Sequence, residues 1–219
     1  MTVRIWSDVR CPFCYIRKRK FEGALEQFPH KDKVNVIWHS FQLDPKLTTQ
    51  PGLHSYDYLG RIKGLDREQV VEMHEHVASV GREVDINFDF ERAIVANSFN
   101  AHRLIQMAKT KGLANAVEEE LFKAHFTEGR NIDDHDTLIA VGTTVGLPVD
   151  EVRQMLASDL YTNEVMEDEA AARAIGIRGV PFFIIDDRLA VSGAQASELF
   201  LRALNKACAD AEIDIVKQS

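Results

Sequence analysis

Residues 6–15 read Trp6-Ser7-Asp8-Val9-Arg10-Cys11-Pro12-Phe13-Cys14-Tyr15, and this stretch decides how the chain folds. The residues from Val3 to Ser7 are mostly β-formers and predict a short, buried strand. After the stretch, apolar side chains recur with the spacing of one helix face, at Phe21, Ala24, Leu25 and Phe28. We therefore predict a strand, a turn and a helix, with two cysteines at the turn.

The two cysteines are separated by two residues, and Pro12 stands at the first helical position, a place that proline favours. Unpaired backbone N–H groups and the positive end of the helix dipole favour a thiolate at Cys11. Cys14 lies one turn further along the helix and is expected to be less accessible. This arrangement predicts thiol–disulfide exchange, in which Cys11 forms a mixed disulfide and Cys14 resolves it.

A zinc site is the main alternative for such a pair. Structural zinc is usually bound by four ligands, commonly with a second CxxC or HxxxH pair. The remaining cysteine, Cys208, is far away in sequence, and no histidines show ligand spacing. We therefore predict no metal site, and we interpret Cys208 as a packed free cysteine of the last helix.

A second motif, Gly179-Val180-Pro181-Phe182-Phe183, places a proline at the start of an apolar strand, where sheets tolerate it. If the Val180–Pro181 bond is cis, the backbone groups of Val180 can lie beside the cysteines. There they can bind an extended substrate through strand-like hydrogen bonds. Val180, Pro181 and Phe13, which stands inside the cysteine motif, are the predicted substrate-binding residues.

The hydrophobic pattern of the rest of the chain predicts the order of its strands and helices. A second strand is predicted over 34–43, and residues 48–64 look irregular. Helices follow over 66–77, 92–109, 114–126, 134–145, 148–157 and 163–175. A β-hairpin with a turn at Asp186-Asp187 and a final helix end the chain. This order predicts an α/β unit that is interrupted by a helical insertion.

Together, the Cys11-Pro12-Phe13-Cys14-Tyr15 motif, the stretch from Gly176 to Phe183 and Val191-Ser192-Gly193-Ala194-Gln195 resemble the FrnE-like branch of the DsbA family. The resemblance implies a thioredoxin fold interrupted by an inserted all-helical domain. Residues 1–50 and 176–219 would form the thioredoxin-like domain, and 51–175 the insertion. It also implies that Cys11 is the nucleophile, Cys14 the resolving thiol and Pro181 a cis-proline opposite them.

The sequence departs from better-known DsbA proteins at two places. The dipeptide between the cysteines is Pro12-Phe13 and has no histidine, which argues against a strongly oxidising potential. Some FrnE-like proteins have an additional C-terminal cysteine pair, whereas this chain has only Cys208 there. We therefore expect a single redox centre.

The composition of the chain argues against nucleic acids and membranes as partners. A net charge of −8 disfavours binding to nucleic acid, and no apolar run approaches the length of a membrane span. The first residues do not resemble a signal peptide, so we predict a cytoplasmic protein without membrane association. The basic run from Arg17 to Lys20 and the acidic run from Glu118 to Glu120 are interpreted as solvated helix faces.

Two other functions remain open at this stage. The same fold with a helical insertion occurs in kappa-class glutathione transferases and hydroxychromene-carboxylate isomerases, which typically have serine where Cys11 stands. We predict no bound cofactor. If the reaction needs a small molecule, we expect glutathione, as electron donor or as co-substrate. A redox-independent chaperone is the other alternative. The predicted partners are thiol- or disulfide-containing proteins or small molecules, with a homodimer possible through the inserted helices.

Overall fold

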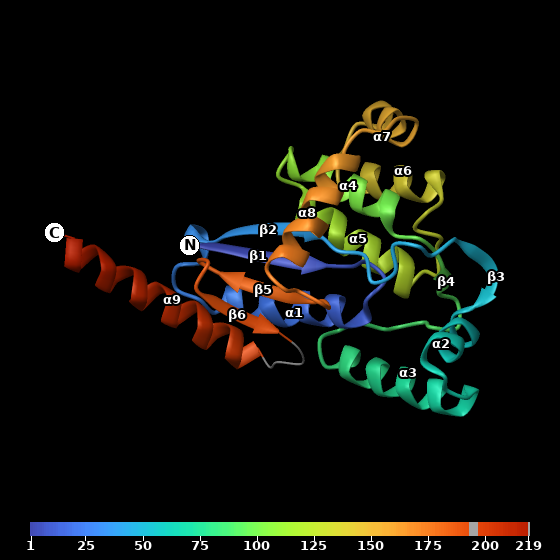
Figure 1. Ribbon diagram of the computed structural model, residues 1–219, viewed down its shortest axis with the longest axis horizontal. Helices are drawn as coiled ribbons and strands as arrows, with labels where there is room; N and C mark the ends of the chain where they lie inside the picture. Colours follow the sequence, from blue (N-terminus) through green and yellow to red (C-terminus); the bar gives the residue numbers. More distant parts are fainter. Residues whose placement is uncertain (193–196, 219) are drawn as a thin grey trace.

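The centre of the protein is a four-stranded sheet. The computed structural model describes residues 1–192 and 197–218. The strands are β1 (Thr2–Ser7), β2 (Asn35–Ser40), β5 (Phe182–Ile185) and β6 (Leu189–Ser192), in the order β2-β1-β5-β6. β1 runs parallel to β2 and antiparallel to β5, and β6 runs antiparallel to β5 (Figure 1). The pairing of β1 with β5 brings the two ends of the chain into one sheet.

Two helices cover one face of this sheet. α1 (Pro12–Glu26) connects β1 to β2, and a short 3-10 helix, Lys31–Lys33, follows it. α9 (Ser197–Gln218) packs against α1, β5 and β6. The rings of Phe21, Phe183 and Phe200 meet between these elements at centroid distances of 4.7–5.6 Å. This aromatic contact fixes α1, and with it the cysteine motif, on the sheet.

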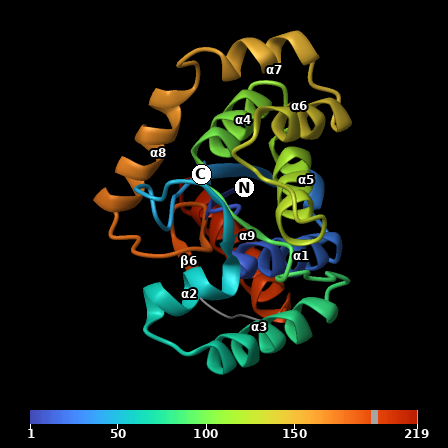
Figure 2. The same cartoon turned by 90° about the vertical axis from the view of Figure 1, so that its right-hand side faces the viewer.

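The insertion between β2 and β5 is larger than the sheet domain it interrupts. Its elements are β3 (Gln50–His54), α2 (Ser55–Lys63), α3 (Arg67–Arg82), β4 (Ile94–Val95), α4 (Phe99–Lys109), α5 (Ala114–Phe126), α6 (His135–Thr144), α7 (Val149–Leu156) and α8 (Thr162–Ala174). Figures 1 and 2 show α4 to α8 on one side of the sheet and α2 and α3 on the other. α4 and α8 contact β2, and α3 contacts α1.

The fold class is confirmed, but the insertion is not wholly helical. β3 and β4 pair as a two-stranded antiparallel sheet, and residues 48–64 contain β3 and α2 where an irregular segment was predicted. The helix predicted over 92–109 begins only at Phe99. Asn97 donates its side-chain N–H to the Leu47 carbonyl and its backbone N–H to the Thr49 hydroxyl. These bonds hold the chain extended before α4, and such short strands have no periodic signal.

Other local predictions agree with the structure. Asp66 and Gln69 form the reciprocal capping box at the start of α3. Gly176 ends α8 with a φ of +79°, a backbone conformation that glycine adopts at no steric cost. Asp186 and Asp187 both have positive φ, as a tight β-hairpin turn requires.

The largest hydrophobic core is shared by the sheet domain and the insertion. It contains Val3 and Phe183 from the sheet together with Leu104 and Leu121 from the inserted helices. The division of the chain at residues 50 and 175 stays a prediction. Residues Gly193 to Gln195 of the last motif lie outside the described residues.

Candidate active site

The cysteine motif lies where β1 ends and α1 begins. Cys11 is the N-cap residue of α1 in an extended backbone conformation, and Pro12 is the first residue of the helix. The Cys11 N–H donates to the Asp8 carbonyl at 2.9 Å, and the Cys14 N–H donates to the Cys11 carbonyl at 2.9 Å. Cys11 is 5% and Cys14 2% exposed, and both are free thiols. The predicted order of accessibility therefore agrees with the geometry.

Val180 and Pro181 lie opposite the cysteines. The Val180–Pro181 bond is cis, and the Val180 carbonyl oxygen is 3.7 Å from the Cys11 Sγ. The β1–β5 register, in which Trp6 faces Phe182, brings the two motifs together across about 170 residues of sequence. The structure thus brings Cys11, Cys14, Val180 and Pro181 to one place, and Phe13 projects beside them with 38% of its surface exposed.

The Cys14 thiol is strongly biased toward its protonated form. Burial is the largest cause of its raised pKa, and the hydrogen bond and charge of Cys11 add to it. The Asp8 backbone N–H and the Ser7 side chain act in the opposite direction and are weaker. Burial and the neighbouring Cys11 thus both favour the protonated Cys14 thiol.

Asp8 fixes the loop that carries Cys11. Its carboxylate is fully buried and accepts backbone N–H bonds from Arg10 at 3.1 Å and from Leu43 at 2.8 Å. Burial raises the pKa of Asp8, but His102, the Leu43 N–H and Arg10 outweigh burial and lower the pKa below its ordinary value. A buried, ionised carboxylate thus joins the turn before Cys11 to the chain after β2.

His102 and Glu118 complete this buried group on the inserted helices. His102 Nε2 is 3.5 Å from Asp8 Oδ1, and the Ser7 hydroxyl donates to Glu118 Oε1 at 2.5 Å. Burial lowers the pKa of His102, but Asp8 and Glu118 raise it above its ordinary value overall. Burial also raises the pKa of Glu118 to about 7. Ser7, Asp8, His102 and Glu118 are called the polar cluster below.

The sequence interpretation missed two members of the polar cluster. His102 was given no role, and Glu118 was expected in solvent but is 1% exposed. A signal for Glu118 was present, because Leu121 and Phe122 follow it at the three- and four-residue spacing of one helix face. Its partner Ser7, however, is distant in sequence, and only packing of α5 against β1 and α1 brings them together.

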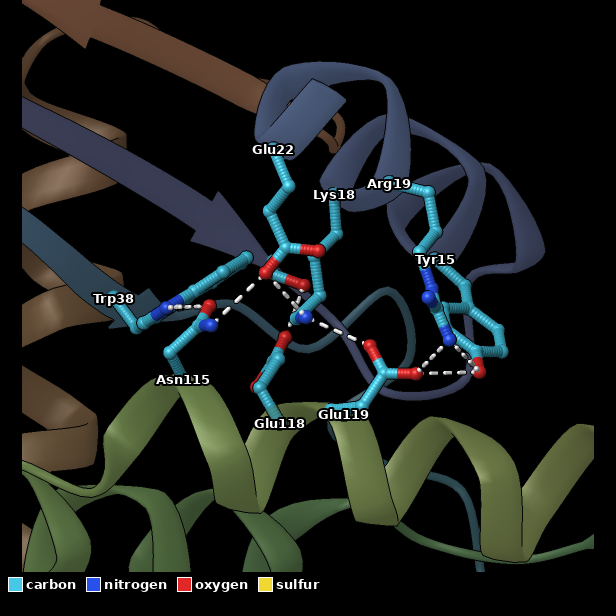
Figure 3. Close-up of polar contacts among 9 residues, drawn as sticks. Tyr15, Lys18, Arg19, Glu22, Trp38, Asn115, Glu118 and Glu119 are labelled. Carbon is cyan, nitrogen blue, oxygen red and sulfur yellow. Dashed lines mark hydrogen bonds and ion pairs between the residues drawn. The ribbon is translucent and has the colours of Figure 1, made fainter. Parts of the chain in front are cut away.

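A second set of ion pairs joins α1 to α5 (Figure 3). Lys18 is buried and lies 2.7 Å from both Glu22 and Glu119, while Tyr15 donates its hydroxyl to Glu119 at 2.8 Å. Arg19 also pairs with Glu119. The basic run was expected in solvent, but Arg17 and Lys18 are buried. Lys18 is buried where α5 packs on α1. These bonds fix the helix that presents the cysteines.

Among the described residues, no group of three or more histidine, cysteine, aspartate or glutamate side chains is arranged to hold a metal ion. In the same part of the chain, no helix combines the length and apolarity of a membrane span. Cys208, on α9, is a free thiol that is partly buried and packs against the core.

Comparisons with known proteins agree with this geometry. A family model described as a DSBA-like thioredoxin domain matches residues 2–205. The chain belongs to the DsbA-like thioredoxin family. A solved structure of a probable DsbA oxidoreductase from Streptomyces coelicolor is 34% identical with a TM-score of 0.89, covering 95% of this chain and 90% of that chain. The uncharacterized protein YwbO of Bacillus subtilis (strain 168) is 26% identical over 209 residues, 93% of this chain and 95% of YwbO.

A more distant structure with a similar fold comes from an enzyme of another name. A 2-hydroxychromene-2-carboxylate isomerase structure is 16% identical with a TM-score of 0.68, and the match covers 100% of both chains. At this identity the similarity shows the shared fold alone. Membership of the FrnE-like branch stays a prediction.

Proposed function

We propose that the protein is a thiol–disulfide oxidoreductase in which Cys11 is the nucleophile and Cys14 the resolving thiol. The observation that supports this most directly is the pairing of an N-cap cysteine with a second, buried cysteine one turn along the same helix. Membership of the DsbA-like family supports an oxidoreductase that acts on thiols or disulfides. The Val180 carbonyl, 3.7 Å from Cys11, supports binding of an extended substrate beside the reacting sulfur.

The proposed reaction has two exchanges. The Cys11 thiolate attacks one sulfur of a substrate disulfide, forms a mixed disulfide and releases the first substrate thiolate. Cys14 then loses its proton and attacks the Cys11 sulfur, which releases the second substrate thiolate and leaves a Cys11–Cys14 disulfide. Two electrons pass from the two protein sulfurs to the substrate. The Cys14 proton and the proton that Cys11 released to solvent on ionising end on the two product thiols. Oxidation of a substrate dithiol is the reverse sequence.

The charges around Cys14 favour its deprotonation in the second exchange and not in the first. Its pKa is raised first by burial and then by the hydrogen bond and charge of Cys11. When Cys11 enters a mixed disulfide, it loses that charge, so one cause of the raised pKa disappears. The resolving thiol therefore becomes easier to deprotonate at the step that needs its thiolate.

The first test is reduction of insulin by dithiothreitol, with variants of each cysteine. Cys11→Ser is expected to lower the rate to the uncatalysed one, and Cys14→Ser is expected to accumulate a mixed disulfide that mass spectrometry detects. Cys208→Ser is the matched control and should retain full activity, since Cys208 belongs to α9 and not to the cysteine motif at the start of α1. Full activity of Cys11→Ser would disprove the proposal.

The same variants test the remaining alternatives. Glutathione is proposed as a reductant, not as a bound substrate for transfer or isomerisation. Calorimetry should therefore find no tight glutathione binding to the Cys11→Ser/Cys14→Ser variant, whereas tight binding would favour a transferase or isomerase. Suppression of client aggregation that is undiminished in this variant would favour a chaperone. Equilibration against a glutathione series would then give the reduction potential and the direction of exchange.

A further inference from the structure

A cavity of about 460 Å³ opens directly beside Cys11. It is called the Cys11 cavity, and its lining includes Arg10, Cys11, Phe13, Leu43, Tyr58 and Ile62. Its volume lies within the range of about 300–1,000 Å³ that is typical of small-molecule sites. The inserted elements α2, α3 and β4 form much of the wall, so the insertion encloses space next to the reactive sulfur.

The rim of this cavity is unusually apolar for a protein surface. Among the described residues, six large hydrophobic side chains are exposed, and three of them, Phe13, Leu43 and Ile62, line the Cys11 cavity. Apolar side chains left in water at a cavity mouth indicate a ligand that covers them. The wall also contains two buried histidines, His74 and His125. Their pKa values are lowered to about 4, chiefly by burial, so both are neutral near pH 7.

One cation at the wall is available to a ligand. The Arg10 guanidinium lies over the Tyr58 ring, 5.6 Å from its centroid. Its charge acts on the buried Asp8 carboxylate, but among the described residues its side chain has no direct ion pair or hydrogen bond. Asp44, the acidic side chain of the wall, accepts hydrogen bonds from the Tyr58 hydroxyl at 3.1 Å and the Lys46 N–H at 3.2 Å. With Lys63 also present, cationic groups outnumber anionic ones at this wall. Guanidinium donors suit a carboxylate.

We infer that the Cys11 cavity binds a small disulfide or thiol that has an apolar body and a carboxylate group. The body lies against the Phe13, Leu43 and Ile62 side chains, the carboxylate pairs with Arg10, and the sulfur meets the Cys11 Sγ. This inference rests on the proposed function and adds the substrate class to it. In a single turnover the reduced protein supplies the two electrons and two protons, so a bound disulfide leaves as two thiols without another reactant.

Binding is tested without redox chemistry. The probe is 4-(methylsulfanyl)benzoate, an unreactive thioether acid, titrated by calorimetry into the Cys11→Ser/Cys14→Ser variant, with uncharged thioanisole for comparison. We expect saturable binding of the acid that weakens at least roughly fivefold on Arg10→Gln, because the ion pair is lost. Arg10→Gln should leave thioanisole binding unchanged. The same loss for both probes would contradict the assignment of the carboxylate to Arg10.

Ile62→Glu tests the apolar rim with little risk to folding, since Ile62 is 58% exposed. It should weaken both probes, and the acid more strongly because of like-charge repulsion. Its matched control is Ile175→Glu, which changes a 53% exposed isoleucine outside the cavity lining and should have no effect. Absence of saturable binding, as expected if the cavity accepts only a side chain of a protein substrate, would overturn the inference.

A kinetic comparison separates this inference from the proposed function. The reduced protein is mixed with 5,5′-dithiobis(2-nitrobenzoate), an aromatic disulfide with carboxylates, or with bis(2-hydroxyethyl) disulfide, which has neither feature. Ile62→Glu should slow the first reaction roughly fivefold or more relative to the second. Equal rates in wild type and Ile62→Glu would overturn the substrate class but leave thiol–disulfide exchange standing. Absence of a Cys11–Cys14 disulfide with either reagent would instead overturn the proposed function, whatever the binding results.

Discussion

The cysteine pair lies between two unlike walls. On one side is the buried polar cluster, in which Asp8 pairs with His102 and the Ser7 hydroxyl donates to Glu118. On the other side is the Cys11 cavity, where apolar side chains face open space. Directional contacts between buried charges fix one geometry, and their loss is costly. Apolar contacts are non-directional and tolerate different shapes. The first wall therefore determines the position of the cysteines, and the second accommodates substrate.

The largest effect is expected from removing the charge of Asp8. Asp8→Asn deprives buried His102 of its counter-ion and the Arg10 and Leu43 N–H groups of one charged acceptor. Loss of one partner of a buried ion pair typically costs about 3–5 kcal/mol. We expect the free energy of unfolding, measured in urea, to fall by this amount.

Asp150→Asn is the matched control for Asp8. The Asp150 side chain is almost fully exposed and pairs with Arg153 at 3.7 Å. Its removal should change the free energy of unfolding by less than about 0.5 kcal/mol. Equal, small effects of the two substitutions would show that the polar cluster contributes no more than a surface ion pair.

A second prediction concerns the pH dependence of stability. Burial raises the pKa of Glu118 from 4.5 to about 7. Between these values the folded state retains a proton that the unfolded state has released, so the stability contributed by this group falls as pH rises. One pKa unit corresponds to about 1.4 kcal/mol, which sets the loss at about 3–4 kcal/mol at most. Glu118→Gln removes this titration and retains an oxygen that can accept the Ser7 hydroxyl.

The measurement is urea unfolding of wild type and Glu118→Gln at several pH values from about 5 to 8. The variant should gain stability relative to wild type as pH rises. His102, Asp8 and Lys18 also act on Glu118 electrostatically, but they are present in both proteins. Parallel pH curves for the two proteins would contradict a raised pKa at Glu118.

The same contrast explains what the sequence could predict. Two short motifs could be recognised from their local pattern of strand, proline and helix. They contain Cys11, Cys14, Val180 and Pro181, which the structure brings together. The polar cluster was not predicted, because Asp8 and His102 are 94 residues apart and no local rule joins them. The Cys11 cavity was missed for a related reason. Its wall includes α2, and residues 48–64 had no recognisable period in the sequence.

The smallest effect is expected at the apolar wall. Phe13→Ala removes a ring that is 38% exposed at the rim of the Cys11 cavity, so the free energy of unfolding should change by less than about 1 kcal/mol. Contact of the ring with an apolar substrate is worth about 1 kcal/mol, so single-turnover reduction of 5,5′-dithiobis(2-nitrobenzoate) should slow roughly fivefold. Met166→Ala, an exposed apolar side chain elsewhere, is the control and should leave the rate unchanged. A large loss of stability in Phe13→Ala, without a selective loss of rate, would contradict this contrast. It would mean that the apolar wall also stabilises the fold and does not serve mainly to bind substrate.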